Sequence, residues 1–114
     1  MKIRALIVDD EPLARQRVRL LLSEEADVEI LGESEDGIEA VAQIEAGKPD
    51  LLFLDVQMPE MDGFELLRRV PQHLLPVVIF TTAYDEFAVK AFEFNALDYL
   101  LKPVDPARLA GFAP

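Results

Sequence analysis

The sequence of 114 residues contains no cysteine, a single histidine and few basic residues. Without cysteine the chain has neither disulfides, nor thiolate chemistry, nor cysteine-ligated metals. Eleven lysines and arginines stand against 22 aspartates and glutamates, and the formal net charge of -11 argues against direct nucleic-acid binding because it repels a phosphate backbone. We expect the one histidine, His73, to be solvated. Arg15, Arg17 and Arg19 would give a first helix a basic strip, either a solvated face or a docking surface for another protein.

Long hydrophobic runs are missing as well. No stretch approaches the roughly 18 apolar residues that a membrane span needs, and the N-terminus lacks the layout of a signal peptide, so we expect a cytoplasmic protein with no membrane partner. Hydrophobic residues nevertheless make up 51% of the chain, which is enough for one packed core. We therefore expect residues 1–114 to form a single domain.

Short apolar runs alternate with amphipathic segments along the chain. Continuously apolar runs at 5–8, 51–54 and 77–80 are typical of strands covered on both faces of a parallel sheet, and weaker runs at 28–31 and 99–101 indicate strands nearer its edges. Segments with helical spacing lie between the runs, and this alternation predicts an α/β fold with five β-α repeats. The last helix would begin at Pro106 and would be short or truncated. Three sequence signals agree with these boundaries: Pro12 at a first helical position, Gly47 with Pro49 at a helix stop, and Asp105-Pro106 at a helix start.

Chemically useful residues close four of the apolar runs. Asp9 and Asp10 follow the first run, Asp55 follows the third, and Thr82 and Lys102 end the fourth and fifth. In an open parallel sheet the ligand crevice lies outside the carboxyl ends of the strands, so residues far apart in sequence meet there. The sequence therefore predicts one pocket that holds three carboxylates, a hydroxyl and an ammonium group.

Three clustered carboxylates favour a bound cation. Two unit charges about 4 Å apart interact by roughly 4 kcal/mol at an effective dielectric near 20, so the acids would repel one another strongly. Oxygen ligands without histidine or cysteine favour Mg²⁺, which commonly binds carboxylates together with a phosphate group. Asp55 can act as a nucleophile toward phosphorus, Lys102 can neutralise the developing charge, and Thr82 can donate a hydrogen bond.

These residues, in this order and spacing, resemble the receiver domain of two-component response regulators. Two longer segments, 84–92 and 96–103, look like the LytR/AlgR (LytTR) branch of that family. The resemblance implies a flavodoxin-like, doubly wound (βα)5 sheet with strand order 2-1-3-4-5. It covers essentially the whole chain and is carried by five motifs: Val-Asp-Asp-Glu-Pro at 8–12, Leu-Asp-Val-Gln-Met-Pro at 54–59, Asp-Gly at 62–63, Thr-Ala at 82–83 and Lys-Pro at 102–103.

The resemblance assigns a role to each acid. Asp55 would accept a phosphoryl group from a sensor histidine kinase or a phosphotransfer protein. Asp10, Asp55 and the backbone carbonyl of Gln57 would bind Mg²⁺ directly, and Asp9 would assist through water. The chain would not be a conventional enzyme, because it would only accept the group and slowly lose it.

The resemblance also implies a switch. Thr82 and Lys102 would bind phosphoryl oxygens, with a cis bond between Lys102 and Pro103, and Tyr99 would change rotamer as Thr82 moves. The face formed by the fourth helix, fifth strand and fifth helix would respond and could form a homodimer. DNA would be bound only by an output domain that follows the receiver in a longer transcription regulator and that is absent from this chain.

Three other functions are open from the residues alone. An aspartyl-nucleophile phosphohydrolase of the haloacid dehalogenase type would carry a second aspartate where this chain has Gln57. A flavodoxin-like cofactor binder would want glycines and hydroxyls where Asp9, Asp10 and Glu11 stand. A receiver used as a constitutive, unphosphorylated interaction module would share the whole motif set.

Overall fold

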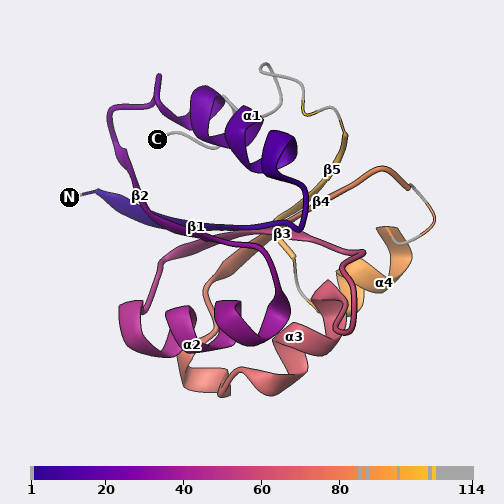
Figure 1. The fold of residues 1–114 in the computed structure, drawn as a ribbon. Coiled ribbons are helices and arrows are strands. Elements are labelled where there is room, and N and C mark those ends of the chain that lie inside the picture. The colour runs from indigo at the N-terminus through magenta and orange to yellow at the C-terminus, as the bar shows by residue number, and fades with distance from the viewer. Residues whose placement is uncertain (1, 85, 87, 95, 103, 105–114) are drawn as a thin grey trace.

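The computed structural model describes residues 2–84, 86, 88–94, 96–102 and 104. Five parallel strands form one sheet in the order β2-β1-β3-β4-β5, as predicted, and helices cover both of its faces (Figure 1). The weaker apolar runs form the edge strands β2 and β5, also as predicted. The elements, in chain order, are β1 (Ile3–Val8), α1 (Pro12–Leu22), β2 (Val28–Ser34), α2 (Gly37–Gly47), β3 (Leu51–Asp55), α3 (Gly63–Arg69), the 3-10 helix η1 (Gln72–Leu74), β4 (Val77–Thr82), α4 (Ala88–Glu93) and β5 (Asp98–Leu101).

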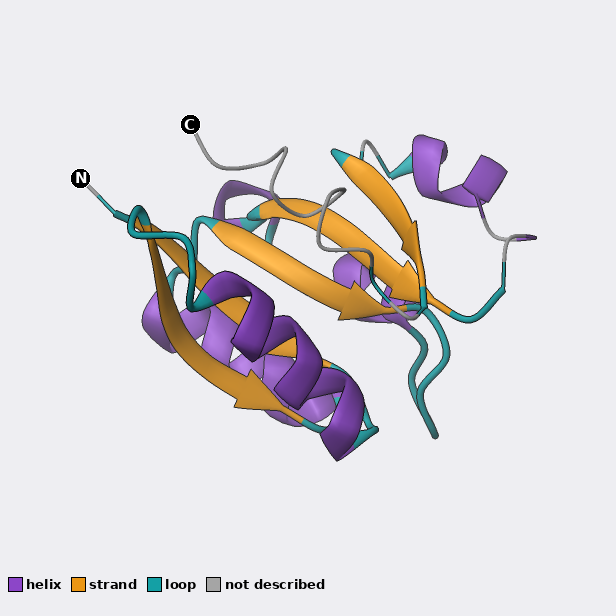
Figure 2. Cartoon of the chain, turned by 90° about the horizontal axis from the view of Figure 1, so that it is seen from above, coloured by secondary structure: helices purple, strands orange, loops and turns teal. Residues whose placement is uncertain are grey.

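The sheet separates two hydrophobic cores. Helix α1 lies across one face, and α2, α3 and α4 lie on the other (Figures 1 and 2). Successive side chains of a strand point to opposite faces, so the continuously apolar strands supply both cores at once. The core on the α1 side contains Ala5, Ile7, Val18, Leu22, Leu51, Phe53, Ile79, Leu100 and Val104. The larger core on the other side contains Leu6, Val8, Leu52, Leu54 and Phe80 from the strands, together with Ala40, Ile44, Phe64 and Leu66 from the helices.

The helix boundaries follow the predicted signals with one shift. Pro12 is the first residue of α1, where its missing amide costs nothing. Helix α2 ends at Gly47, but the left-handed position beyond it is taken by Lys48, with φ 49°, rather than by the glycine. The predicted last helix and the Lys102–Pro103 bond lie outside the described residues. Within the described chain no helix has both the length and the hydropathy of a membrane span.

Two features of the strands were not predicted. Val77, at the start of β4, is 49% exposed although its run was predicted to be covered on both faces. Strands β1 and β2 change register between Ala5, which pairs with Ile30, and Leu6, which pairs with Gly32. Leu31 is therefore an extra residue on the edge strand and is exposed.

The three arginines of α1 do not form one basic strip. Arg15 and Arg19 lie one helical turn apart and share Glu33 of β2, with Nε–O distances of 3.1 and 2.6 Å. Arg17 points to the other side, where its guanidinium donates two hydrogen bonds, of 3.2 and 3.0 Å, to the carbonyl oxygen of Val104. The predicted strip was wrong because residues two apart on a helix point away from each other.

Candidate functional site

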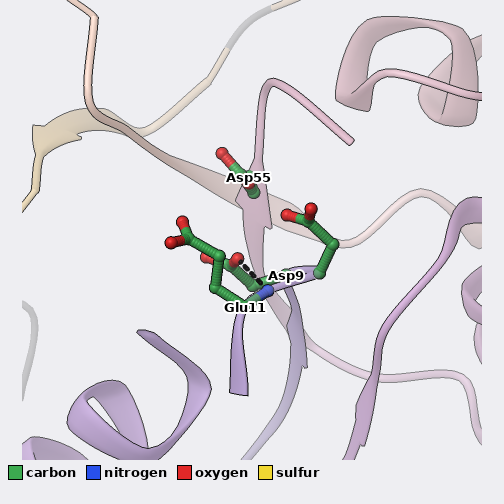
Figure 3. A group of neighbouring side chains, drawn as sticks. Asp9, Glu11 and Asp55 are labelled. Carbon is green, nitrogen blue, oxygen red and sulfur yellow. Dashed lines mark hydrogen bonds between the residues drawn. The ribbon is translucent and has the colours of Figure 1, made fainter. Parts of the chain in front are cut away.

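The carboxyl ends of the strands bring together the charged residues that the sequence singled out. Asp55, at the end of β3, lies beside Asp9 and Glu11, which come from the loop after β1 (Figure 3). The Lys102 ammonium nitrogen lies 2.8 Å from Asp9 Oδ2, 2.9 Å from Glu11 Oε1 and 3.5 Å from Asp55 Oδ2. One cation therefore faces three carboxylates.

The backbone around Asp55 is packed too closely for any residue but glycine at position 63. The Gly63 amide donates a 2.8 Å hydrogen bond to the Val56 carbonyl, and a Cβ at Gly63 would lie 2.7 Å from the Asp55 carbonyl oxygen. Asp62 caps α3 by accepting a 2.8 Å hydrogen bond from the Glu65 amide. The Asp-Gly motif thus starts α3 directly against the end of β3 and fixes the loop that follows Asp55.

The backbone at Lys102 is tied to β4. Its amide donates a 2.7 Å hydrogen bond to the Thr82 carbonyl, which extends the pairing of β5 with β4 by one residue. The side chain then reaches back over the sheet to a position where it is only 16% exposed. Strand pairing therefore places the lysine at the same edge of the sheet as Asp55, which ends β3, and Asp9, which follows β1.

Burial and the neighbouring charges shift the pKa values of Asp55 and Lys102. Burial and repulsion from the Asp9 carboxylate raise the pKa of Asp55 from 3.8 to about 7, although Lys102 and a hydrogen bond from the Gln57 amide act in the opposite direction. Burial alone would lower the pKa of the Lys102 ammonium, but its contacts with Asp9 and Glu11 outweigh burial and raise the pKa above its usual range. With a pKa of about 7, Asp55 is protonated in about half of the molecules near neutral pH unless a further cation stabilises its charge.

An all-oxygen set of donors surrounds this point. Asp9, Asp10, Glu11 and Asp55 each offer a carboxylate oxygen, and these atoms lie within 4.8 Å of one another. The Gln57 amide donates a 3.4 Å hydrogen bond to Asp55 Oδ1, so the backbone of residue 57 lies beside the acids as well. The chemistry of these donors fits a hard divalent cation such as Mg²⁺. Sequence reasoning noted Glu11 as an acid but did not place it in the site; its position directly after Asp9-Asp10 was the available signal.

Thr82 is completely buried at the end of β4, one residue beyond Thr81, the register partner of Asp55. Its hydroxyl oxygen accepts a 3.2 Å hydrogen bond from the Tyr84 amide. The carbonyl of the same Tyr84 accepts a hydrogen bond from the Tyr99 hydroxyl of β5. The backbone of Tyr84 thus links the two predicted switch residues, a role that the sequence did not reveal because it depends on backbone atoms.

Two cavities open beside the site. One, of about 360 Å³, lies on the α1 side and has Asp9, Glu11, Arg17, Lys102 and Val104 among its lining residues. The other, of about 530 Å³, has the loop after Asp55 for one wall and Phe64 and Lys90 for another. The acids therefore lie at the carboxyl edge of the sheet, and a cavity opens on each side of β3, the strand that ends at Asp55.

The comparisons with known proteins agree with this geometry. Residues 5–112 match the response regulator receiver domain family. The transcriptional regulatory protein BtsR of Escherichia coli (strain K12) is 50% identical over 107 residues, which are 94% of this chain and 45% of BtsR. The crystal structure of the response regulatory domain of protein mrkE from Klebsiella pneumoniae has a TM-score of 0.86 at 37% identity and covers 95% of this chain and 89% of that one. The receiver domain of AraT, a response regulator from Geobacillus stearothermophilus, has a TM-score of 0.86 at 39% identity, covering 97% and 89%.

The chain belongs to the response regulator receiver domain family, because the match spans most of its length and the fold and motifs agree. It spans about half the length of the curated relatives that it matches.

Proposed function

We propose that Asp55 is the phosphoacceptor of a two-component response regulator and that a sensor histidine kinase or a phosphotransfer protein donates the phosphoryl group. The observation that carries the proposal is the cluster itself: a buried carboxylate at a strand end, raised in pKa, with a lysine 3.5 Å away and three further acids beside it. Burial of the Asp9 and Asp55 carboxylates side by side costs stability, and such costs concentrate at functional sites.

The acids would hold the cation that the reaction needs. Asp10, Asp55 and the Gln57 carbonyl would bind Mg²⁺ directly, and Asp9 would act through water. The bound ion would neutralise charge on the phosphoryl oxygens and on the acids. A cation would also lower the pKa of Asp55 and thereby supply the carboxylate as nucleophile.

In the transfer step, an Asp55 oxygen forms a bond to phosphorus and the bond from phosphorus to the donor's imidazole nitrogen breaks. The electron pair of the broken bond stays on the imidazole, and Asp55 becomes an acyl phosphate. Lys102 would pair with the phosphoryl oxygens, and Thr82 would donate its hydroxyl hydrogen to one of them. Positioning and charge neutralisation are the main requirements of phosphoryl transfer, and both are met by these residues.

The switch would run from Thr82 to Tyr99. A phosphoryl group that draws the Thr82 hydroxyl toward Asp55 would compete with the hydrogen bond from the Tyr84 amide, and the Tyr84 carbonyl is the acceptor of the Tyr99 hydroxyl. Movement of this backbone would change α4 and β5, and with the fifth helix they would form the responsive face, through which the protein would also form a homodimer. The fifth helix lies outside the described residues.

The receiver would control transcription through a DNA-binding output domain in a longer regulator. Residues 1–114 would be its receiver domain, the protein would be cytoplasmic, and by the resemblance of segments 84–92 and 96–103 it would belong to the LytR/AlgR (LytTR) branch. The name of BtsR, a transcriptional regulatory protein, supports the transcriptional role. The receiver itself would not be a conventional enzyme, since it would lose its phosphoryl group only slowly.

The test is to incubate the chain with Mg²⁺ and a small phosphoryl donor such as acetyl phosphate and to measure intact mass. We expect one phosphoryl group per chain, none in Asp55→Ala, and none when Mg²⁺ is chelated. An unmodified chain under all conditions would favour a constitutive interaction module. Continuous release of phosphate from an added phosphate ester would favour a phosphohydrolase instead.

A further inference from the structure

Glu11 is the N-cap residue of α1, yet its side chain does not serve the helix. Within the described residues its carboxylate accepts no hydrogen bond from the first turn of α1, which is the usual task of a side chain at this position. The carboxylate instead reaches Lys102, 91 positions away, with an Oε1–Nζ distance of 2.9 Å. The Glu11 side chain therefore contacts the candidate site instead of capping α1.

This contact occupies the lysine that the phosphoryl group would use. An ammonium group has three N–H donors, and three carboxylates already surround Lys102. A phosphoryl group on Asp55 would take over the place of Asp55 Oδ2, the most distant of the three. Lys102 would still be shared with Asp9 and Glu11, which reduces the charge it offers to phosphoryl oxygens.

Of these two remaining partners, only Glu11 is free to leave. The Asp9 side chain is 5% exposed and its Oδ1 accepts a hydrogen bond of 2.9 Å from the Glu11 amide, so its movement would leave a buried charge unpaired. The Glu11 side chain is 64% exposed and can exchange Lys102 for water.

We infer that the Glu11 carboxylate competes with the phosphoryl group for the Lys102 ammonium group. By pairing with Lys102, Glu11 weakens the interaction of the lysine with a phosphoryl group on Asp55. The inference rests on the proposed function of Asp55 and adds to it a residue that sets the affinity of the site. Glu11 acts through Lys102 and is a positioning residue, since it touches neither the acceptor oxygen nor phosphorus.

A double-mutant cycle with beryllofluoride, a stable mimic of the phosphoryl group, tests the inference. The dissociation constant is measured by calorimetry at saturating Mg²⁺ for the wild type, Glu11→Gln, Lys102→Met and the double variant. An exposed ion pair is weak, so we expect Glu11→Gln to tighten binding about two- to fivefold when Lys102 is present and to have no effect in Lys102→Met. Glu11→Asp, which keeps the charge but shortens the reach, should resemble Glu11→Gln.

Three results would overturn the inference while leaving the phosphoacceptor intact. Unchanged or weaker beryllofluoride binding by Glu11→Gln would show that Glu11 supports the lysine rather than competes for it, and equal tightening in both lysine backgrounds would reduce its effect to general charge. A loss of more than about tenfold in Mg²⁺ affinity without beryllofluoride would make Glu11 a metal ligand instead. If the wild type itself binds no beryllofluoride, both the inference and the proposed function fail.

Discussion

Two charge clusters that involve α1 have opposite compositions. The site cluster (Asp9, Glu11, Asp55 and Lys102) has three carboxylates around one cation, and the Glu33 cluster (Glu33, Arg15 and Arg19) has two cations around one carboxylate. The side chains of Asp9 and Asp55 are both 5% exposed, whereas those of Arg15, Glu33 and Arg19 are 16, 29 and 46% exposed. The more solvated cluster has enough cations to neutralise its acid, but the cluster with two buried carboxylates and excess acid would be stabilised by another cation. The difference separates a structural ion pair from a candidate binding site, although both join the same helix to the sheet.

Removal of the lysine should have the largest effect, because it takes the only cation from the site cluster. We expect Lys102→Met to lose about 3 kcal/mol in free energy of unfolding at pH 8 without divalent cations, since buried carboxylates are left unpaired. Urea denaturation followed by circular dichroism measures this loss. Mg²⁺ should restore much of it. A variant as stable as the wild type would mean that water already compensates the acids.

Divalent cations should stabilise the site cluster and leave the Glu33 cluster unaffected. At a Mg²⁺ concentration 100 times the dissociation constant, we expect the free energy of unfolding to rise by about 2.7 kcal/mol, and chelation should reverse the gain. Asp10→Ala should reduce this stabilisation strongly, whereas Glu33→Gln should retain it. Thermal unfolding with and without Mg²⁺ tests the contrast, and equal loss in both variants would contradict it.

The pH dependence of stability should reveal Asp55. Because its pKa is about 7 in the folded chain and 3.8 is its ordinary value, the folded state binds more protons than the unfolded state between these two values. The contribution of Asp55 to stability therefore falls as pH rises from about 4 to about 7 and is constant above that. Without divalent cations Asp55→Asn should exceed the wild type by about 2 kcal/mol at pH 8, and the difference should vanish near pH 4. A difference that does not change with pH would show that Asp55 titrates normally.

The smallest effect should come from the Glu33 cluster. Glu33→Gln removes a partly buried ion pair to Arg15 and a more solvated one to Arg19, so we expect a loss of about 1 kcal/mol in stability and no change in phosphoryl incorporation. Arg15 keeps its 2.7 Å hydrogen bond to the Asp9 carbonyl, which holds the loop of the site. A strong loss of incorporation in this variant would mean that the two clusters are coupled through Arg15.

The sequence predicted those features that depend on local pattern. Apolar runs identified the strands, and the polar residues that close them identified the site, because strand ends in a parallel sheet converge whatever the loops do. The sequence could therefore predict that Asp9, Asp55 and Lys102 lie close together without any information on distances.

Long-range contacts were beyond such a prediction. The contact between Glu11 and Lys102 spans 91 positions, and the two hydrogen bonds from Arg17 to Val104 span 87. No periodicity indicates which distant backbone or side chain an exposed charge will meet. The exposed Val77 shows the same limit, since hydropathy alone does not reveal which residue of an apolar run is exposed to solvent.

The extra residue of the sheet lies on the strand that supplies none of the candidate site residues. Strands β1, β3, β4 and β5 each lead into a charged or hydroxyl group of the site, whereas β2 accommodates Leu31 and only supports Asp9 through the Ser34 carbonyl, at 3.0 Å. An insertion within any of these four strands would turn the following side chains to the opposite face of the sheet, and the candidate site residue of that strand would leave the site. Length variation among strands should therefore be tolerated at β2 alone, which makes that edge a suitable place to graft a probe or a label without disturbing the candidate site.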